Sequence, residues 1–260
     1  MPFVVALAQL DNIYRLVDIE FAAFRDEKVN QQLSYRDAEN PEHVQRTVNA
    51  YKKYLLSSTP LFQDQRTLSL SDGTAGDDVP STYVFRKVTD PMTGKIIAFA
   101  KTWTGALTLE DLRKPPDHGY EDEPEVNRKW MALNEKLHRD YVGLSRHAYF
   151  GMLATHPDHQ HQGAATMLMD EIVEAADVAG VEIYLEATAK GRPLYEKYGF
   201  VPVHDIVFDA AEYGGHGIGV EKQTVMVRAA LQERQYRYRV RTWDVAVAEA
   251  KVAVNLAAGR

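Results

Sequence analysis

Apolar residues recur with helical spacing in the segment that follows Gly163. From there to Gly180 they return every three or four residues, and acidic side chains occupy the opposite face of the expected helix. Just before this segment, residues 148–155 form a short, mostly apolar run that stops near Pro157 and predicts a strand. The pattern therefore predicts a strand, a tight turn and a helix that ends at Gly180.

The same two kinds of pattern predict the other elements of a mixed α/β protein. Strands are expected over residues 3–9, 82–89, 95–103, 182–187, 201–208 and 223–229. Helices are expected over residues 11–25 with Asp11 as N-cap, from Pro41 onward, and over 127–142. The first two helices are joined by a link at residues 27–40, and the strands at 82–89 and 95–103 are expected to form a hairpin.

Two segments interrupt this order of elements. Residues 57–81 are rich in Ser, Thr, Asp and Gly, and we expect a mobile connection with one short strand over 66–70. Residues 105–126 form an insertion that ends in an acidic run over 121–125. A solvated loop is the simpler interpretation of the acidic run, and an acidic rim that attracts a cationic amine is the alternative.

The start of the helix after Gly163 has the chemistry of an anion-binding site. A helix N-terminus presents unpaired backbone N–H groups and the positive end of the helix dipole. Gly163 leaves room for a phosphate to approach the main chain, and Ala164 and Ala165 keep side chains out of the way. No acidic residue lies between His159 and Met169, so nothing in this segment would repel an anion.

Composition narrows the classes of protein that need to be considered. The chain has 260 residues, 45% of them hydrophobic, which suits one large domain with insertions. The net charge of −7 argues against a dedicated nucleic-acid binder, and the lack of cysteine rules out thiolate catalysis and Cys-ligated zinc. The sequence shows no signal-peptide pattern and no membrane-length apolar run. We expect no membrane partner and a cytoplasmic setting, with the nucleus as the alternative.

Two blocks of sequence resemble the GNAT superfamily of N-acetyltransferases. Gln160-x-x-Gly163-x-Ala165 resembles the pyrophosphate loop Q/R-x-x-G-x-G/A of that family. Residues 181–203 resemble the family's next strand and helix, including its Leu-Tyr-Glu-Lys-x-Gly-Phe ending. The layout looks like that of fungal members. The resemblance implies an α/β fold with a mostly antiparallel sheet of about six or seven strands, splayed between the fourth and fifth and flanked by helices.

The resemblance also implies where acetyl-CoA, the expected co-substrate, would bind. Backbone amides from His161 to Thr166 would hold the pyrophosphate, and main-chain groups of two residues on the central strand would bind the pantetheine arm. The N–H of Leu153 would polarise the thioester carbonyl, and Tyr195 would act as general acid toward the thiolate, with Tyr198 as the alternative. The expected cofactor-binding residues are Leu153, Thr155, Gln160, His161, Gln162, Gly163, Ala164, Ala165, Thr166, Thr188 and Tyr195.

Other polar residues near these blocks leave alternatives open. The general base is not settled, and the candidates are Glu186, His147 and His216. Lys190 and Arg192 either reach the phosphates of CoA or stay solvated. One further group has the side chains of a metal site, but it spans the turn whose backbone is wanted for phosphate, so we expect no metal. Its members are His156, Asp158, His159 and His161.

Residues 231–260 are expected to extend an acetyltransferase domain that occupies residues 1–230. Arginines alternate with other residues over 237–242 and predict a strand with one cationic face, followed by a helix capped by Asp244 that ends at Gly259. Such a face would bind RNA or a phosphate, or it would serve as an edge strand or subunit contact. The second interpretation is the simpler one, so we expect no nucleic-acid partner and consider a homodimer through this extension.

The function that follows from the resemblance is acetyl-CoA-dependent N-acetylation of a primary amine, most simply on a small-molecule acceptor. An enzyme that acetylates protein lysines or N-termini is the nearest alternative. A non-catalytic acyl-CoA-binding protein is a second alternative, since it would keep the fold without turnover.

Overall fold

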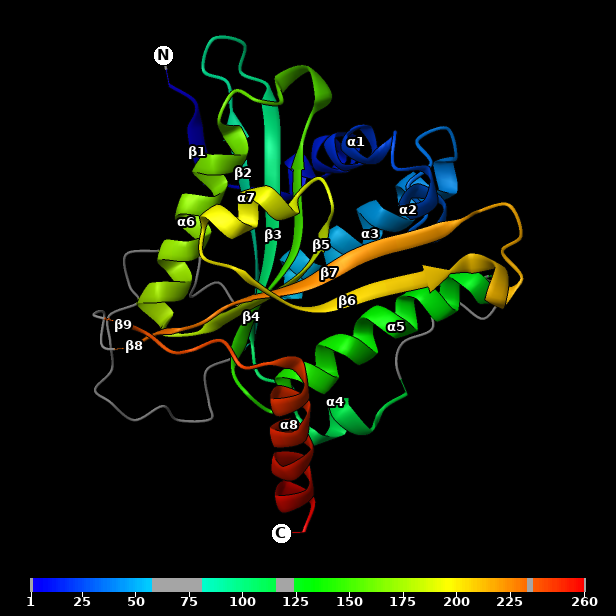
Figure 1. Cartoon of the computed structure of the whole chain (residues 1–260). Coiled ribbons are helices and arrows are strands. Elements are labelled where there is room, and N and C mark those ends of the chain that lie inside the picture. Colours follow the sequence, from blue (N-terminus) through cyan, green and yellow to red (C-terminus); the bar gives the residue numbers. More distant parts are fainter. Residues whose placement is uncertain (1, 58–80, 116–123, 233–235, 260) are drawn as a thin grey trace.

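Seven strands with apolar residues pair side by side in one mixed sheet (Figure 1). The structure is a computed structural model that describes residues 2–57, 81–115, 124–232 and 236–259. The strands of the sheet are β1 (Val4–Leu7), β2 (Thr82–Thr89), β3 (Ile96–Gly105), β4 (His147–Thr155), β5 (Glu182–Thr188), β6 (Val201–Asp209) and β7 (Val220–Arg228). Their order is β1-β2-β3-β4-β5-β7-β6, and every neighbouring pair is antiparallel except β4 and β5. The predicted fold class and the strands predicted for this sheet are confirmed.

Helices cover both faces of this sheet because each buries one apolar side. The longer ones are α1 (Ile13–Phe24), α3 (Pro41–Ser57), α5 (Glu125–Val142), α6 (Ala164–Ala179) and α8 (Trp243–Ala258); the shorter ones are α2 (Lys28–Leu33), α4 (Leu109–Arg113) and α7 (Arg192–Lys197). In Figure 1, α6 lies on one side of the sheet and α1, α2 and α3 lie on the other. No helix in the described part of the chain is both long and apolar enough to cross a membrane.

The strands β4 and β5 pair over a short stretch only. Residues His147–Tyr149 pair with Glu182–Tyr184, and beyond them the two strands diverge. The outer edges of both strands remain paired, β4 with β3 and β5 with β7. The predicted splay is therefore present, and it leaves one edge of β4 without a strand partner from residue 150 onward.

A β-bulge interrupts β4 next to the splay. Lys101 of β3 pairs with Met152, and the next residue, Thr102, pairs with Phe150, so Gly151 is the extra residue. Bulges of this kind bend a strand and redirect its neighbouring groups. The periodicity of the sequence carries no sign of this bulge.

Several local predictions were wrong. Asp11 does not cap a helix, because it lies inside a 3₁₀ turn over Leu10–Asn12, which α1 continues. The link at residues 27–40 contains α2, and the insertion at 105–126 contains α4, whose Thr108 side chain accepts a hydrogen bond from the Asp111 N–H at 3.1 Å. The predicted strand over 66–70 lies outside the described residues, as does most of the acidic run over 121–125.

The predicted cationic strand in the C-terminal segment was also wrong. Only Arg237 of that stretch lies in a strand, β9 (Tyr236–Arg237), which pairs with β8 (Leu231–Gln232). The N-cap position of α8 is Thr242, and Asp244 lies in the first turn of the helix instead. The helix ends at Gly259 as predicted and packs on α5, with Ala246 buried against that helix. The domain division at residue 230 and the homodimer stay predictions.

Two of the three arginines of the predicted cationic strand, Arg237 and Arg241, bind acidic side chains within the chain. Arg237 and Arg228 both form ion pairs with Asp177 near the end of α6, each at 2.7 Å. Arg241 forms ion pairs with Glu182 of β5 at 3.0 Å and with Glu249 of α8 at 3.2 Å. Two of the three arginines of the expected cationic face are therefore engaged by carboxylates, which weakens the case for RNA binding there.

The Asp177 contacts predict a pH-dependent contribution to stability. Partial burial alone would raise the pKa of this carboxyl, but hydrogen bonds from Arg237 and Arg228 outweigh it and lower the pKa from 3.8 to about 2. A depressed pKa stabilises the fold above the unfolded value, and that stabilisation is lost as the pH falls toward the folded value. The shift corresponds to about 2 kcal/mol at neutral pH.

We expect Asp177→Asn to lower the free energy of unfolding by at least about 2 kcal/mol at neutral pH, because Arg228 is then buried without its partner. The difference from the unmodified protein should shrink as the pH falls from about 5 to about 2. Urea denaturation across that range measures it, with the exposed Asp26→Asn as control. A difference that does not change with pH would contradict the assigned pairing.

Candidate functional site

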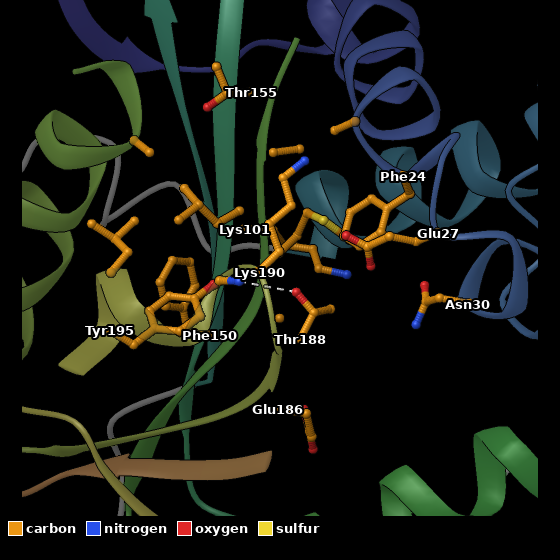
Figure 2. A pocket seen from close by; sticks show the side chains of 18 of the residues that line it. Phe24, Glu27, Asn30, Lys101, Phe150, Thr155, Glu186, Thr188, Lys190 and Tyr195 are labelled. Atoms are coloured by element: carbon orange, nitrogen blue, oxygen red, sulfur yellow. Dashed lines mark hydrogen bonds between the residues drawn. The ribbon is translucent and has the colours of Figure 1, made fainter. Parts of the chain in front are cut away.

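A pocket of about 620 Å³ lies where β4 and β5 diverge. Its walls come from α1, α2, β3, β4, α5, the start of α6, β5 and α7, so it reaches both faces of the sheet (Figure 2). Of the residues predicted to bind the co-substrate, all but one line it: Leu153, Thr155, Gln160, His161, Gly163, Ala164, Ala165, Thr166, Thr188 and Tyr195. The exception is Gln162, whose side chain donates a hydrogen bond to the Asp158 carbonyl at 3.2 Å.

The start of α6 presents free backbone donors to one end of the pocket. The Met167 N–H donates to the Gly163 carbonyl at 3.1 Å, and the three helical amides before it precede the first complete turn. Gly163 has φ of 89°, a left-handed conformation that favours glycine, and an added Cβ there would meet no atom within 4 Å. The first turn holds no acidic side chain. The geometry suits an anion at this point.

The turn before α6 is held to the end of β4. Gln160 donates a side-chain hydrogen bond to the Thr155 carbonyl at 3.2 Å. His161 has φ of 59°, which is uncommon outside glycine and makes the sharp change of direction into the helix. The Gln160 side chain and the left-handed backbone of His161 and Gly163 thus fix the conformation of the loop.

The main-chain groups of Leu153 and Thr155 point into the splay. The His156 N–H donates to the Ile97 carbonyl at 2.9 Å, so it faces β3. Successive residues of a strand point their N–H groups to opposite sides, so those of Thr155 and Leu153 face away from β3. These groups are therefore available to a ligand that lies between β4 and β5.

Tyr195 lies on α7 on the same side of the sheet as α6. Its ring packs edge-on against Phe150, with ring centroids 5.9 Å apart, and also contacts Phe200. Burial raises the pKa of its hydroxyl, so it carries its proton at neutral pH, and within the described residues that hydroxyl has no hydrogen-bond partner. A Cβ on Gly191 would lie 3.1 Å from the Tyr195 ring, so glycine at this position leaves room for that ring.

Tyr198, the alternative general acid, is engaged elsewhere. Its hydroxyl lies 2.6 Å from the Asp170 carboxylate and 3.0 Å from the Thr166 carbonyl. Burial and the hydrogen bond to Asp170 raise its pKa to about 12. It is not among the residues that line the pocket. Its hydroxyl instead links α7 to the first turns of α6.

Among the three candidate bases, only Glu186 lines the pocket. Its Oε2 accepts a hydrogen bond from the Tyr149 hydroxyl at 2.9 Å, and its Oε1 is buried without a hydrogen bond in the described residues. Burial raises the pKa of this carboxyl to about 7, although the nearby Tyr184 hydroxyl partly offsets the effect of burial. A carboxylate with such a pKa exchanges protons readily near neutral pH.

The two histidines considered as bases lie outside the pocket. His147 is buried at the start of β4, with its ring nitrogens 2.6 Å from His138 Nε2 and 2.9 Å from the Ser145 carbonyl. Burial lowers its pKa to about 4, so it is neutral at physiological pH. His216 lies exposed in the connection between β6 and β7. The structure thus separates both of them from Glu186.

Of the two cationic residues considered as ligands of the CoA phosphates, one lines the pocket and the other does not. Lys190 lines the pocket, whereas Arg192 pairs with Glu196 at 2.8 Å on the surface of α7. His156 lies 3.6 Å from Asp158. Among the residues that the structure describes, no group of three or more His, Asp or Glu side chains is arranged to hold a metal ion.

The sequence did not single out three charged residues in the pocket wall, which are Glu27, Arg36 and Lys101. Lys101 projects from β3, and Glu27 lies between α1 and α2, where burial raises its pKa (Figure 2). The sequence does contain a signal for Lys101, because it is the one charged residue in the mostly apolar stretch 96–103. Glu27 stands in an unpatterned link, so nothing local distinguishes it.

Comparison with known families bears on the segment that builds this pocket. Residues 127–202 match the family model of the acetyltransferase (GNAT) domain. They hold β4, the loop, α6, β5 and α7, which contribute to the pocket wall around the start of α6. A search of curated proteins gave no match.

Solved structures with a similar fold extend the likeness to most of the chain. A mosquito arylalkylamine N-acetyltransferase-like 5b is 12% identical, with 87% of this chain and 99% of that one covered and a TM-score of 0.58. Arylalkylamine N-acetyltransferase 2 from Aedes aegypti is 15% identical, with 88% and 99% covered and a TM-score of 0.56. A Corynebacterium glutamicum structure described as "histone acetyltransferase HPA2 and related acetyltransferase" is 16% identical, with 89% and 98% covered and a TM-score of 0.51.

The fold is therefore the GNAT fold, and residues 127–202 match the acetyltransferase (GNAT) domain within it. At such low identity the solved structures show the fold alone. They leave the substrate class open, and the expectation of a fungal-type member stays a prediction.

The two ends of α6 provide a matched test of the anion site. Gly163 and Gly180 are both left-handed, with φ of 89° and 62°, and each would place a Cβ in open space. Glutamate at either position should carry a similar backbone cost of about 1–2 kcal/mol. Only Gly163→Glu puts a negative charge at the pocket, so we expect it to weaken CoA binding at least tenfold, or about 1.4 kcal/mol.

Isothermal titration calorimetry with CoA measures this effect, and Gly180→Glu is the control. An unaltered affinity in Gly163→Glu would place the CoA site elsewhere. Equal losses of CoA affinity in both variants would show that the substitutions act by disturbing the helix and not by placing a charge at the anion site.

Proposed function

We propose that the protein is an acetyl-CoA-dependent N-acetyltransferase that acts on a primary amine of a small molecule. The observation that carries the proposal is the pocket itself. It joins a helix N-terminus on one side of the splay to the carboxylate of Glu186 on the other. Donor and acceptor would thus meet at the gap between β4 and β5.

The residues at the donor end fit CoA. The amides of Ala164, Ala165 and Thr166 would hold the pyrophosphate, and the main chain of Leu153 and Thr155 would hold the pantetheine arm. When bound, acetyl-CoA supplies a thioester whose acetyl group can pass to an amine. The Leu153 N–H would stabilise negative charge on the carbonyl oxygen, as a single-donor oxyanion site.

The residues at the acceptor end fit a cationic amine that must lose a proton before it attacks. Glu186 would take that proton, directly or through a water molecule, on its unpartnered Oε1. Tyr149 would act as a positioning residue, because its hydroxyl fixes the other carboxylate oxygen at 2.9 Å. Tyr195 would protonate the departing thiolate from the opposite side of the sheet.

Aromatic and apolar side chains favour a small acceptor over a protein one. The acceptor end is walled by α1, α2 and α5, which contribute Phe24, Trp130 and Met131 beside Tyr149. Two proteins of similar fold are named as arylalkylamine N-acetyltransferases, so arylalkylamines are the first acceptors to try.

A panel assay that follows CoA release tests the proposal. The panel should include arylalkylamines, amino acids, polyamines, amino sugars, lysine peptides and peptides with free N-termini. Turnover confined to small amines is expected. Preference for peptides would make the protein a lysine or N-terminal acetyltransferase, and tight acetyl-CoA binding without turnover would make it a non-catalytic acyl-CoA-binding protein.

We expect Tyr195→Phe to lower kcat by about 100-fold, since it removes the proposed general acid. CoA affinity should stay the same because the ring still packs on Phe150. Steady-state kinetics and calorimetry measure the two quantities. If Tyr198→Phe lowered kcat instead, the role would pass to Tyr198.

The pH profile tests Glu186. Because burial raises the pKa of its carboxyl to about 7, kcat/KM should rise with pH through that value as the base loses its proton. Glu186→Gln should remove this limb and lower kcat/KM by about 100-fold at neutral pH. Tyr149→Phe should shift the limb while Glu186 remains in place. A profile that Glu186→Gln leaves intact would contradict the assignment.

A further inference from the structure

Lys101 enters the pocket from the middle of the sheet. It lies on β3 opposite Met152, beside the bulge of β4. A Cβ on Gly151 would lie 3.1 Å from Lys101 Cε and 3.7 Å from Nζ, so the glycine of the bulge makes room for the lysine side chain. Phe99, two residues earlier on the same strand, faces α1 and α3, so Lys101 also faces that side of the sheet.

Within the described residues, Lys101 Nζ has no hydrogen bond and no ion pair. It lies 5.1 Å from the ring centroid of Tyr51 and 5.3 Å from that of Tyr54. The nearby carboxylate of Glu20 is already bound by Arg36 at 2.7 Å and by the Tyr51 hydroxyl. The ammonium therefore faces the pocket with aromatic rings, and no carboxylate of its own, beside it.

Burying a charged lysine destabilises the fold unless an anion or a hydrogen-bond acceptor pairs with it. Burial lowers its pKa to about 8, which still leaves most of the side chain charged at neutral pH. A simple cationic amine in this pocket would be repelled by it. An acceptor that also carries a negative charge would instead give the lysine its missing partner.

The two acidic residues of the pocket wall, Glu186 and Glu27, lie apart from Lys101. Glu186 is on β5, and β4 lies between it and β3, so the two backbones are at least about 10 Å apart. Glu27 lines the acceptor end from the α1–α2 side. Figure 2 shows the three side chains at separate places along the wall. The pocket thus offers one site for an ammonium group and another for an anion.

We propose that Lys101 binds a carboxylate on the acceptor, so that the amine which the protein acetylates belongs to an amino acid or a related amino-carboxylate. This inference rests on the proposed function and names the substrate class of the same site. Lys101 acts as a specificity-determining residue that selects the acceptor by its charge. The proton transfers still belong to Glu186 and Tyr195.

Binding of matched ligand pairs to the CoA-loaded protein tests the inference. The pairs are L-phenylalanine with phenethylamine, 4-aminobutyrate with butylamine, and 6-aminohexanoate with hexylamine. We expect at least one carboxylate to bind more tightly than its partner amine. In Lys101→Met the affinity for that carboxylate should fall about tenfold or more, and the affinity for the amine should not fall. The control variant is Lys87→Met on the neighbouring strand, which should bind both ligands like the unmodified protein.

Proton uptake gives a second readout that needs no variant. Near pH 8 about half of Lys101 is neutral, so pairing with a carboxylate should draw up to about half a proton from the buffer. Calorimetry in buffers of different ionisation enthalpy measures this uptake. Amines that bind as well as their carboxylate partners in the unmodified protein, or a preference that survives in Lys101→Met, would overturn the inference.

The two proposals fail in different ways. Turnover of small amines without any preference for carboxylates would leave the acetyltransferase standing and remove the role of Lys101. Selective carboxylate binding that depends on Lys101, without turnover of any ligand, would keep the binding role and remove the acetyltransferase.

Discussion

The separation of β4 from β5 is the constraint on which the rest of this structure depends. The two strands share only three paired residues, while their outer edges stay paired with β3 and β7. Within the described residues, the inner edges of β4 and β5 have no strand partner beyond residues 149 and 184. The main-chain groups of Leu153 and Thr155 are thereby left facing a pocket instead of a neighbouring strand, and a ligand can replace the missing one.

The splay also brings together groups from opposite faces of the sheet. The start of α6 and Tyr195 lie on one side, and Glu186, Tyr149 and Lys101 reach the pocket from the other. The N-terminus of a helix and a buried carboxylate therefore belong to one cavity, although different layers of the fold supply them. In our account this arrangement lets a proton leave the amine on one side while another reaches the thiolate on the other.

Sequence patterns were sufficient where local interactions determine the structure. The strand, turn and helix over residues 148–180 could be predicted because their apolar spacing and end glycines act within the segment itself. The short helices α2 and α4 could not, because six- and five-residue helices depend on tertiary contacts more than on periodicity. The alternating arginines of the tail predicted a strand, and the pattern could not show that Arg237 and Arg241 bind Asp177 and Glu182, which are distant in sequence.

The acceptor end was the least predictable part of the site. It draws on α1, α2, β3, β5 and α5, and the bulge that exposes Lys101 exists only through the register of β3 against β4. Such a register is a property of two strands and leaves no mark in either one alone. Sequence reasoning therefore named the donor loop in advance and left three bases open, of which the structure brings one into the pocket.

A crystal structure of the complex with CoA would show directly whether the gap between β4 and β5 is the CoA site. We predict that the pyrophosphate lies within hydrogen-bonding distance of the backbone amides of Ala164, Ala165 and Thr166. The pantetheine arm should lie between β4 and β5, with its thiol near the Tyr195 hydroxyl. CoA bound elsewhere, or a complex in which the gap between β4 and β5 holds no part of it, would contradict the account.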